Sequence, residues 1–166
     1  MVSFQPLRKM DVLEITLWKY GPPHDIYNHR PEEREQDIRY MLDPLNGFFS
    51  IRAGGGELIG FCSFGKDAQV SGGDYGGDAL DTGLGIRPDI TGRGMGIRII
   101  GEVLGFAERQ FRPAEYRVTI AAFNERALRA WKLAGFIEMQ EFHRSGDGRK
   151  FIILTRKSTL DTGEGR

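Results

Sequence analysis

The segment that most constrains the fold is a strand-like run that ends in three glycines at alternate positions, where a helical pattern begins. Residues 85–98 read Gly-Ile-Arg-Pro-Asp-Ile-Thr-Gly-Arg-Gly-Met-Gly-Ile-Arg, with glycine at 92, 94 and 96. Glycines here permit positive φ and remove side chains that would keep an anion from the backbone N–H groups. The positive end of a helix dipole lies at the same point. The segment therefore predicts an anion-binding turn, although a purely structural glycine turn fits the same pattern.

Two common phosphate-binding motifs do not account for this turn. No Gly-Lys-Ser/Thr follows it, which excludes a Walker loop. A Rossmann fingerprint fits poorly, because the turn lies in mid-chain after strands that are expected to be antiparallel. A dinucleotide-binding fold is therefore the weaker interpretation.

Hydrophobic periodicity on both sides of the turn predicts an α/β (α+β) fold in the order β-α-α-β-β-β-α-β-α-β-β. The segment between the third and fourth strands is a glycine-rich stretch and is expected to be a mobile surface loop. The expected strands are residues 2–7, 48–52, 57–64, 80–87, 116–122, 136–142 and 150–155, and the expected helices are about 9–18, 31–42, 94–111 and 124–134.

Length and composition limit the classes of protein to which the chain can belong. Its 166 residues suit one domain, expected over residues 1–157, with a disordered tail at 158–166. Lys plus Arg equals Asp plus Glu at 23 each, so the net charge is zero. Such a balance favours neither nucleic acid nor a membrane as partner. No apolar run is long enough to span a membrane or to act as a secretion signal.

Cysteine and histidine usage bears on compartment and metal chemistry. Cys62 is the single cysteine and lies in a strand-like segment, which indicates a buried thiol in a reducing, cytoplasmic location. The three histidines have neither the spacing nor the companion cysteines of a metal site, so no metal is expected.

A second motif lies downstream of the glycine turn. Residues 124–136 read Asn-Glu-Arg-Ala-Leu-Arg-Ala-Trp-Lys-Leu-Ala-Gly-Phe. Together with Thr-Gly-Arg-Gly-Met-Gly at 91–96, this run resembles the GNAT superfamily of N-acetyltransferases. The resemblance implies a mixed, mostly antiparallel sheet of about seven strands with helices on both faces. It also implies acetyl-coenzyme A as cosubstrate.

The resemblance implies where that cosubstrate and the acceptor bind. In the implied fold, the strands at 80–87 and 116–122 lie parallel and splay apart. The backbone groups that this leaves free bind pantetheine, and the glycine turn holds pyrophosphate. The acceptor lies against the first two helices, their loop and the last hairpin, where His24 and His29 are less direct candidates. The implied coenzyme-binding residues are Leu84, Gly85, Ile86, Thr91, Gly92, Arg93, Gly94, Met95, Gly96, Ile97, Asn124, Ala127 and Trp131, and the implied acceptor-binding residues are Trp18, Tyr20, Tyr27 and His143.

Two positions depart from the family pattern. Thr91 stands where Gln or Arg is usual, and its hydroxyl still offers one hydrogen bond. Trp131 stands where many members carry an acidic Tyr, and an indole N–H is not a usable acid. Trp131 is expected either to pack against the coenzyme arm or to fill the core. A coenzyme A thiolate, with a pKa near the 8.5 of cysteine, is a fair leaving group without an acid.

The general base is the least constrained assignment. Asp81 lies at the start of the strand that presents the acetyl group, with Asp78 and Glu141 as rivals. A strand-end Asp that hydrogen-bonds its own loop is the competing structural interpretation.

The expected function is acetyl transfer to a small-molecule or peptide amine by direct attack in a ternary complex. The alternative is a non-catalytic acyl-CoA-binding or sensor domain. The sequence leaves open the acceptor's identity and whether the protein is a monomer or a homodimer.

Overall fold

The computed structural model describes residues 1–158, so the predicted tail lies outside the described residues apart from Ser158. The strands are β1 (Val2–Pro6), β2 (Phe48–Ala53), β3 (Leu58–Phe64), β4 (Leu80–Ile86), β5 (Glu115–Ala121), β6 (Ile137–His143) and β7 (Lys150–Lys157). The α-helices are α1 (Lys9–Thr16), α2 (Arg34–Leu42), α3 (Met95–Phe111) and α4 (Glu125–Leu133). The 3₁₀ turns are η1 (His24–Tyr27), η2 (Pro31–Glu33), η3 (Pro44–Asn46), η4 (Lys66–Ala68) and η5 (Pro88–Ile90).

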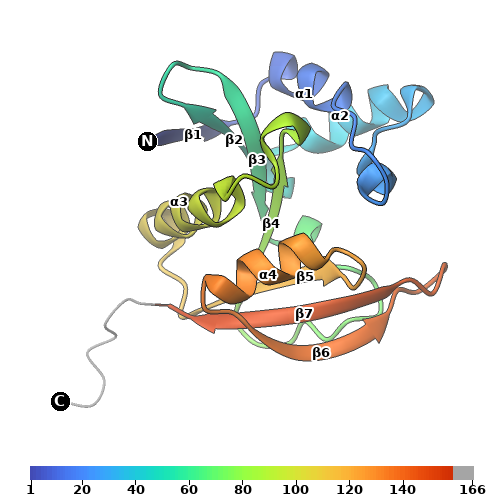
Figure 1. Ribbon diagram of the computed structural model, residues 1–166, viewed down its shortest axis with the longest axis vertical. Coiled ribbons are helices and arrows are strands. Elements are labelled where there is room, and N and C mark those ends of the chain that lie inside the picture. Colours follow the sequence, from blue (N-terminus) through green and yellow to red (C-terminus); the bar gives the residue numbers. More distant parts are fainter. Residues whose placement is uncertain (159–166) are drawn as a thin grey trace.

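The strands form one seven-stranded sheet in the order β1-β2-β3-β4-β5-β7-β6. Every neighbouring pair is antiparallel except β4 with β5, which is parallel. Figure 1 shows β1 to β4 gathered toward the top of the molecule and β5 to β7 toward the bottom. The predicted element order and mostly antiparallel sheet are confirmed.

Helices cover both faces of the sheet because successive strand residues point to opposite sides. Ile152 and Leu154 of β7 join the core under α3 and α4, whereas Phe151 and Ile153 face a smaller cluster under the glycine-rich loop. A third cluster packs α1 and α2 against β2 and β3. Ile100, Leu104 and Ala107 at the centre of α3 are buried, whereas Ile97 at its start is 37% exposed and Phe111 at its end is 45% exposed.

The glycine-rich loop, residues 65–79, is attached to the sheet at several points. The Tyr75 hydroxyl accepts a hydrogen bond from Val70 N–H at 2.9 Å and lies 2.7 Å from Thr119 Oγ1. Ser145 N–H donates to Ser71 O at 3.0 Å. The loop thus covers the face of the β5–β7 half that no α-helix covers.

A buried ion pair joins the two halves of the sheet. Asp81 and Arg117 are register partners in the β4–β5 pairing, which includes only one other pair, Leu80 with Tyr116. Arg117 Nε donates to Asp81 Oδ1 at 2.6 Å and Arg117 Nη2 to Oδ2 at 2.8 Å. Gln69 Nε2 also donates to Asp81 Oδ2 at 2.8 Å. The strands diverge beyond this clamp, as the family resemblance implies.

Replacing Asp81 with Asn is expected to destabilise the fold, because Arg117 would stay buried without its counter-charge. The free energy of unfolding should fall by roughly 3–5 kcal/mol in urea denaturation. Glu138→Gln is the control, since it breaks a half-exposed pair with Lys132 and should cost less than about 1 kcal/mol. Equal losses in the two variants would contradict the role of this clamp.

Candidate active site

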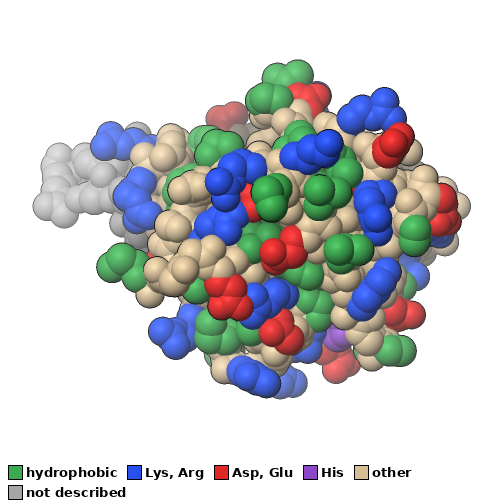
Figure 2. Space-filling model, turned by 90° about the horizontal axis from the view of Figure 1, so that it is seen from above, with side chains coloured by type: hydrophobic (Ala, Val, Ile, Leu, Met, Phe, Trp, Pro, Cys, Tyr) green, Lys and Arg blue, Asp and Glu red, His purple; other side chains and the backbone are tan. Residues whose placement is uncertain are grey.

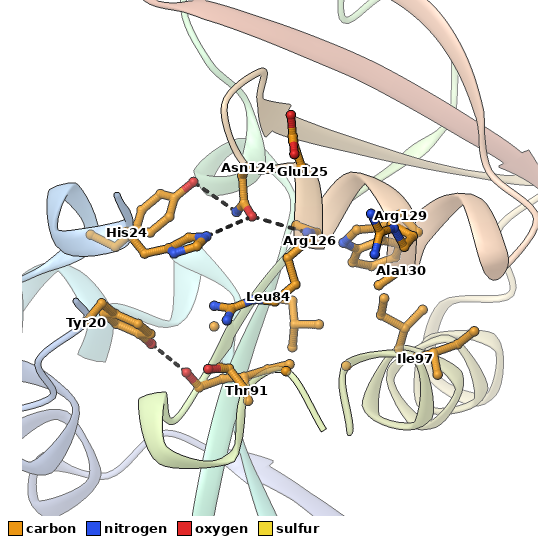
Figure 3. Close-up of a pocket in the computed structure, with 18 of the residues that line it drawn as sticks. Tyr20, His24, Leu84, Thr91, Ile97, Asn124, Glu125, Arg126, Arg129 and Ala130 are labelled. Carbon is orange, nitrogen blue, oxygen red and sulfur yellow. Dashed lines mark hydrogen bonds between the residues drawn. The ribbon is translucent and has the colours of Figure 1, made fainter. Parts of the chain in front are cut away.

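A cavity of about 680 Å³ lies where β4 diverges from β5. Its walls come from α1 and the loop after it, the second half of β4, the start of α3, and α4 (Figure 3). It brings together most of the residues expected from the sequence. Those that line it are Trp18, Tyr20, Tyr27, Leu84, Gly85, Ile86, Thr91, Gly92, Gly94, Gly96, Ile97, Asn124, Ala127 and Trp131.

The glycine turn has the backbone geometry of an anion cradle. Gly92 and Gly94 have φ of +80° and +73°, values that favour glycine over L side chains. Gly94 is the N-cap of α3 and offers no side-chain cap, so the first N–H groups of this 17-residue helix have no cap partner. A Cβ at Gly94 would meet no atom within 4 Å, so the space beside these N–H groups is open. The turn therefore fits a pyrophosphate.

Arg126 adds positive charge to this turn, and the motif comparison did not single it out. Its Nη1 lies 3.7 Å from where a Cβ on Gly92 would stand. Figure 3 shows its side chain reaching from α4 into the cavity. The expected hydroxyl of Thr91 instead donates to Pro88 O at 2.8 Å, inside the turn itself. The positive charge beside Gly92 therefore comes from Arg126. Over the face of the molecule that Figure 2 shows, acidic and basic side chains are interspersed.

The edge of β4 forms the middle of the cavity. One edge of β4 pairs with β3 as far as Ile86, while the other loses its partner after Asp81. Glycine is required at position 85 because of a neighbouring aromatic ring, and not because a ligand approaches the backbone there. A Cβ there would lie 2.3 Å from the ring of Phe61, another residue in the cavity wall. The glycine thus makes room for an aromatic wall.

Trp131 both fills the core and forms part of the cavity wall. It is 5% exposed and packs edge-on against Phe136 with ring centroids 5.0 Å apart. It also lines the cavity.

The wall opposite Trp131 carries a tyrosine hydroxyl. Tyr20 donates to Ile86 O at 2.6 Å, and burial raises its pKa to about 12.

Asn124 links that opposite wall to α4. Its Oδ1 accepts from Ala127 N–H at 3.2 Å, so Asn124 is the N-cap of α4. The same oxygen lies 3.3 Å from His24 Nε2, and Asn124 Nδ2 donates to the Tyr27 hydroxyl at 3.2 Å. Figure 3 shows Asn124 facing His24 across the cavity. The cap joins residues three positions apart, whereas the contacts of Asn124 with His24 and Tyr27 join residues about 100 positions apart in sequence.

Some expected site residues lie elsewhere. Asp81 is 4% exposed, both of its oxygens are bonded to Arg117 or Gln69, and it is absent from the cavity wall. This geometry favours the structural interpretation of Asp81 over that of a base. Arg93, Met95 and His143 also lie outside the cavity lining, as do the rival bases Asp78 and Glu141. His143 is exposed on β6, the outer strand of the sheet.

His24 and His29 do line the cavity, together with Ile15 and Phe61. Across residues 1–158, no three His, Cys, Asp or Glu side chains are placed to hold a metal ion. Within the same range, no helix is both long and apolar enough to cross a membrane.

Asn124 is expected both to stabilise α4 as its N-cap and to contribute to the cavity. Two variants separate these roles. Asn124→Ala should lower the free energy of unfolding by about 1 kcal/mol, the usual value of an N-cap. Asn124→Asp keeps the cap and should keep the stability. It should still turn over more slowly, because a carboxylate cannot donate to Tyr27 and adds negative charge to the cavity. Urea denaturation and steady-state rates measure both, and full activity in Asn124→Asp would leave Asn124 as a cap alone.

Comparison with known proteins agrees with this geometry. Residues 10–136 match the profile of the Acetyltransferase (GNAT) family. A spermidine N-acetyltransferase chimera from Vibrio cholerae and hSSAT has 16% identity and a TM-score of 0.71 over 95% of each chain. The V. cholerae spermidine N-acetyltransferase in complex with CoA and spermine has 16% identity and a TM-score of 0.69, also over 95% of each chain. No curated protein matches in sequence. With most of its length matched, the chain belongs to the GNAT acetyltransferase family and is an acetyl-CoA-dependent acyltransferase.

Proposed function

We propose that the protein transfers the acetyl group of acetyl-CoA to a primary amine by direct attack in a ternary complex. The observation that carries this proposal is the continuity of one cavity. It runs from the glycine turn at the start of α3, past the unpaired edge of β4, to an aromatic wall after α1. A thioester and an amine held in one cavity react without a covalent enzyme intermediate.

Each wall has a distinct task in this reaction. The amides of the Gly92 to Gly94 turn, the α3 dipole and Arg126 hold the pyrophosphate. The free edge of β4 orients pantetheine and offers N–H groups to the carbonyl oxygen. Coenzyme A supplies the activated acetyl group and a thiolate that leaves without a dedicated acid, since Trp131 carries no acidic proton.

The acceptor end of the cavity favours an amine with an apolar body and a single positive charge. Its wall is formed by Ile15, Trp18, Tyr20, Tyr27 and Phe61. Aromatic faces attract an ammonium group by about 0.5–2 kcal/mol. Glu125 is the single carboxylate in the lining, beside two arginines, so successive charges of a polyamine find few partners. This composition suits an arylalkylamine better than the spermine named for the V. cholerae protein.

An amine panel is the decisive test of function. With acetyl-CoA present, we expect thiol release with phenethylamine or benzylamine at a higher kcat/KM than with spermidine. A non-catalytic acyl-CoA sensor predicts a different outcome, in which acetyl-CoA binds by calorimetry but no amine releases the thiol. A clear preference for spermidine would contradict the proposed acceptor class while leaving amine acetylation intact.

Arg126→Met is expected to weaken acetyl-CoA binding about 10-fold, the loss of one charge-assisted contact worth roughly 1.5 kcal/mol. The dissociation constant should also depend less on salt than in the unaltered protein. Arg39→Met is the matched control, because Arg39 is exposed on α2 and lies outside the cavity wall. Unchanged affinity in Arg126→Met would remove Arg126 from the pyrophosphate site.

A further inference from the structure

A histidine in the cavity wall is hydrogen-bonded to a carboxylate of α2 that lies outside the lining. His29 follows η1 in the loop and lines the cavity, and Asp37 lies in α2. His29 Nδ1 is 2.8 Å from Asp37 Oδ2, and the two side chains are 25% and 26% exposed. Both are thus partly shielded from water, and the ring remains open to the cavity.

The partner of Nδ1 determines the chemistry of the other ring nitrogen. An ionised carboxylate can only accept hydrogen bonds, so Nδ1 of His29 carries the hydrogen. In the neutral ring, Nε2 then presents a lone pair. No protein hydrogen bond occupies His29 Nε2 within residues 1–158. The ring therefore has the tautomer and the free nitrogen of a general base.

We propose that His29 accepts the proton released by the acceptor amine and that Asp37 is a positioning residue that fixes its tautomer. The proposal rests on amine acetylation as the reaction. The amine nitrogen attacks the acetyl carbon, a C–N bond forms and the C–S bond breaks. The ammonium proton passes to His29 Nε2, directly or through one water, and then to solvent. The thiolate leaves with the bonding electron pair and takes a proton from solvent.

Other titratable or charged groups around the cavity are poorly suited to this task. They are Tyr20, His24, Tyr27, Glu125, Arg126 and Arg129. Burial raises the pKa of Tyr20 to about 12 and also raises that of Tyr27, so both phenols stay neutral near pH 7. His24 differs from His29 in its partner, because its Nε2 donates to the neutral amide oxygen of Asn124 and not to a carboxylate, and its lone pair lies on Nδ1. The arginines are permanent cations.

Glu125 is the carboxylate in the described lining, and it differs from His29 in the basicity of its side-chain group. It lies in the first turn of α4 and is a carboxylate, which is a weaker base than an imidazole. An amine proton is transferred more readily to an imidazole, whose ordinary pKa is near 6.5, than to a carboxylate near 4.3.

The test compares His29→Gln, Asp37→Asn and the control Glu35→Gln, which removes an exposed carboxylate from the same helix. His29→Gln should lower kcat at least about 100-fold, the usual contribution of a general base, with acetyl-CoA affinity unchanged by calorimetry. The unaltered enzyme should lose kcat as the pH falls through the range where histidines titrate, and His29→Gln should lack this limb. Glu35→Gln should match the unaltered enzyme in rate and pH profile.

Asp37→Asn gives a readout that does not depend on turnover. Nitrogen-15 NMR of the protein without acetyl-CoA should show hydrogen on His29 Nδ1 in the unaltered chain. In Asp37→Asn the hydrogen should move to Nε2, because the new amide can donate to Nδ1. The kcat of this variant should fall as well. If His29→Gln fails to fold, the shift of tautomer together with the fall in kcat of Asp37→Asn still tests the pair.

The outcomes separate this proposal from the proposed function. Absence of thiol release with every amine in the unaltered protein would contradict the acetyltransferase function itself. An active unaltered protein whose His29→Gln variant keeps both its rate and its acidic limb would overturn the role of His29 alone. So would hydrogen on Nε2 in the unaltered chain.

Discussion

The short parallel contact between β4 and β5, held by the buried Asp81–Arg117 pair, is the constraint on which the site depends. Two strands that stayed paired along their length would leave no free edge and no cavity. Here they are joined at Leu80 and Asp81 and then diverge, so the apex of the divergence must resist opening further. A bidentate ion pair shielded from solvent does this, and Arg117 also donates to the carbonyls of Tyr75 and Gly76 in the covering loop. Both oxygens of this carboxylate are hydrogen-bonded, and the pair maintains the shape of the site.

The features predictable from sequence are those in which local backbone geometry decides the outcome. The glycines at 92 and 94 require positive φ, and Asn124 caps the helix that follows it, so both were identified from a few neighbouring residues. The mostly antiparallel sheet and its one parallel pair followed from the family resemblance, because they belong to the whole fold. Gly85 shows the limit of this reasoning. Its position was expected, but its cause is the Phe61 ring on the neighbouring strand.

Features that depend on contacts between distant segments could not be predicted in the same way. Asp81 looked like a base because of its place in the strand, and only the side chain of Arg117 on another strand reveals its buried pairing. His143 was grouped with the acceptor residues by element, yet strand parity turns it outward on β6. Arg126 lies inside the second motif, but its place beside the glycine turn could not be predicted, because its proximity to Gly92 exists only in the folded chain. The His29–Asp37 bond likewise joins a loop to a helix with no periodic signal.

The loop after α1 is joined by hydrogen bonds to both β4 and α4. Tyr20 donates to the carbonyl of Ile86 on the coenzyme side of the cavity, and Asn124 holds His24 and Tyr27 from α4. The 3₁₀ turns η1 and η2 of this loop contain no buried residue, whereas Trp18 at its start is buried in the cluster with α1 and α2. The position of η1 therefore depends on these hydrogen bonds and on ring contacts of His24 and Tyr27 with Phe123. A ligand that orders β4 and the start of α4 therefore also orders the wall that receives the amine. Because these hydrogen bonds join both ends of the cavity, ordering of one wall by either ligand would lower the entropy cost of ordering the other wall for the second ligand.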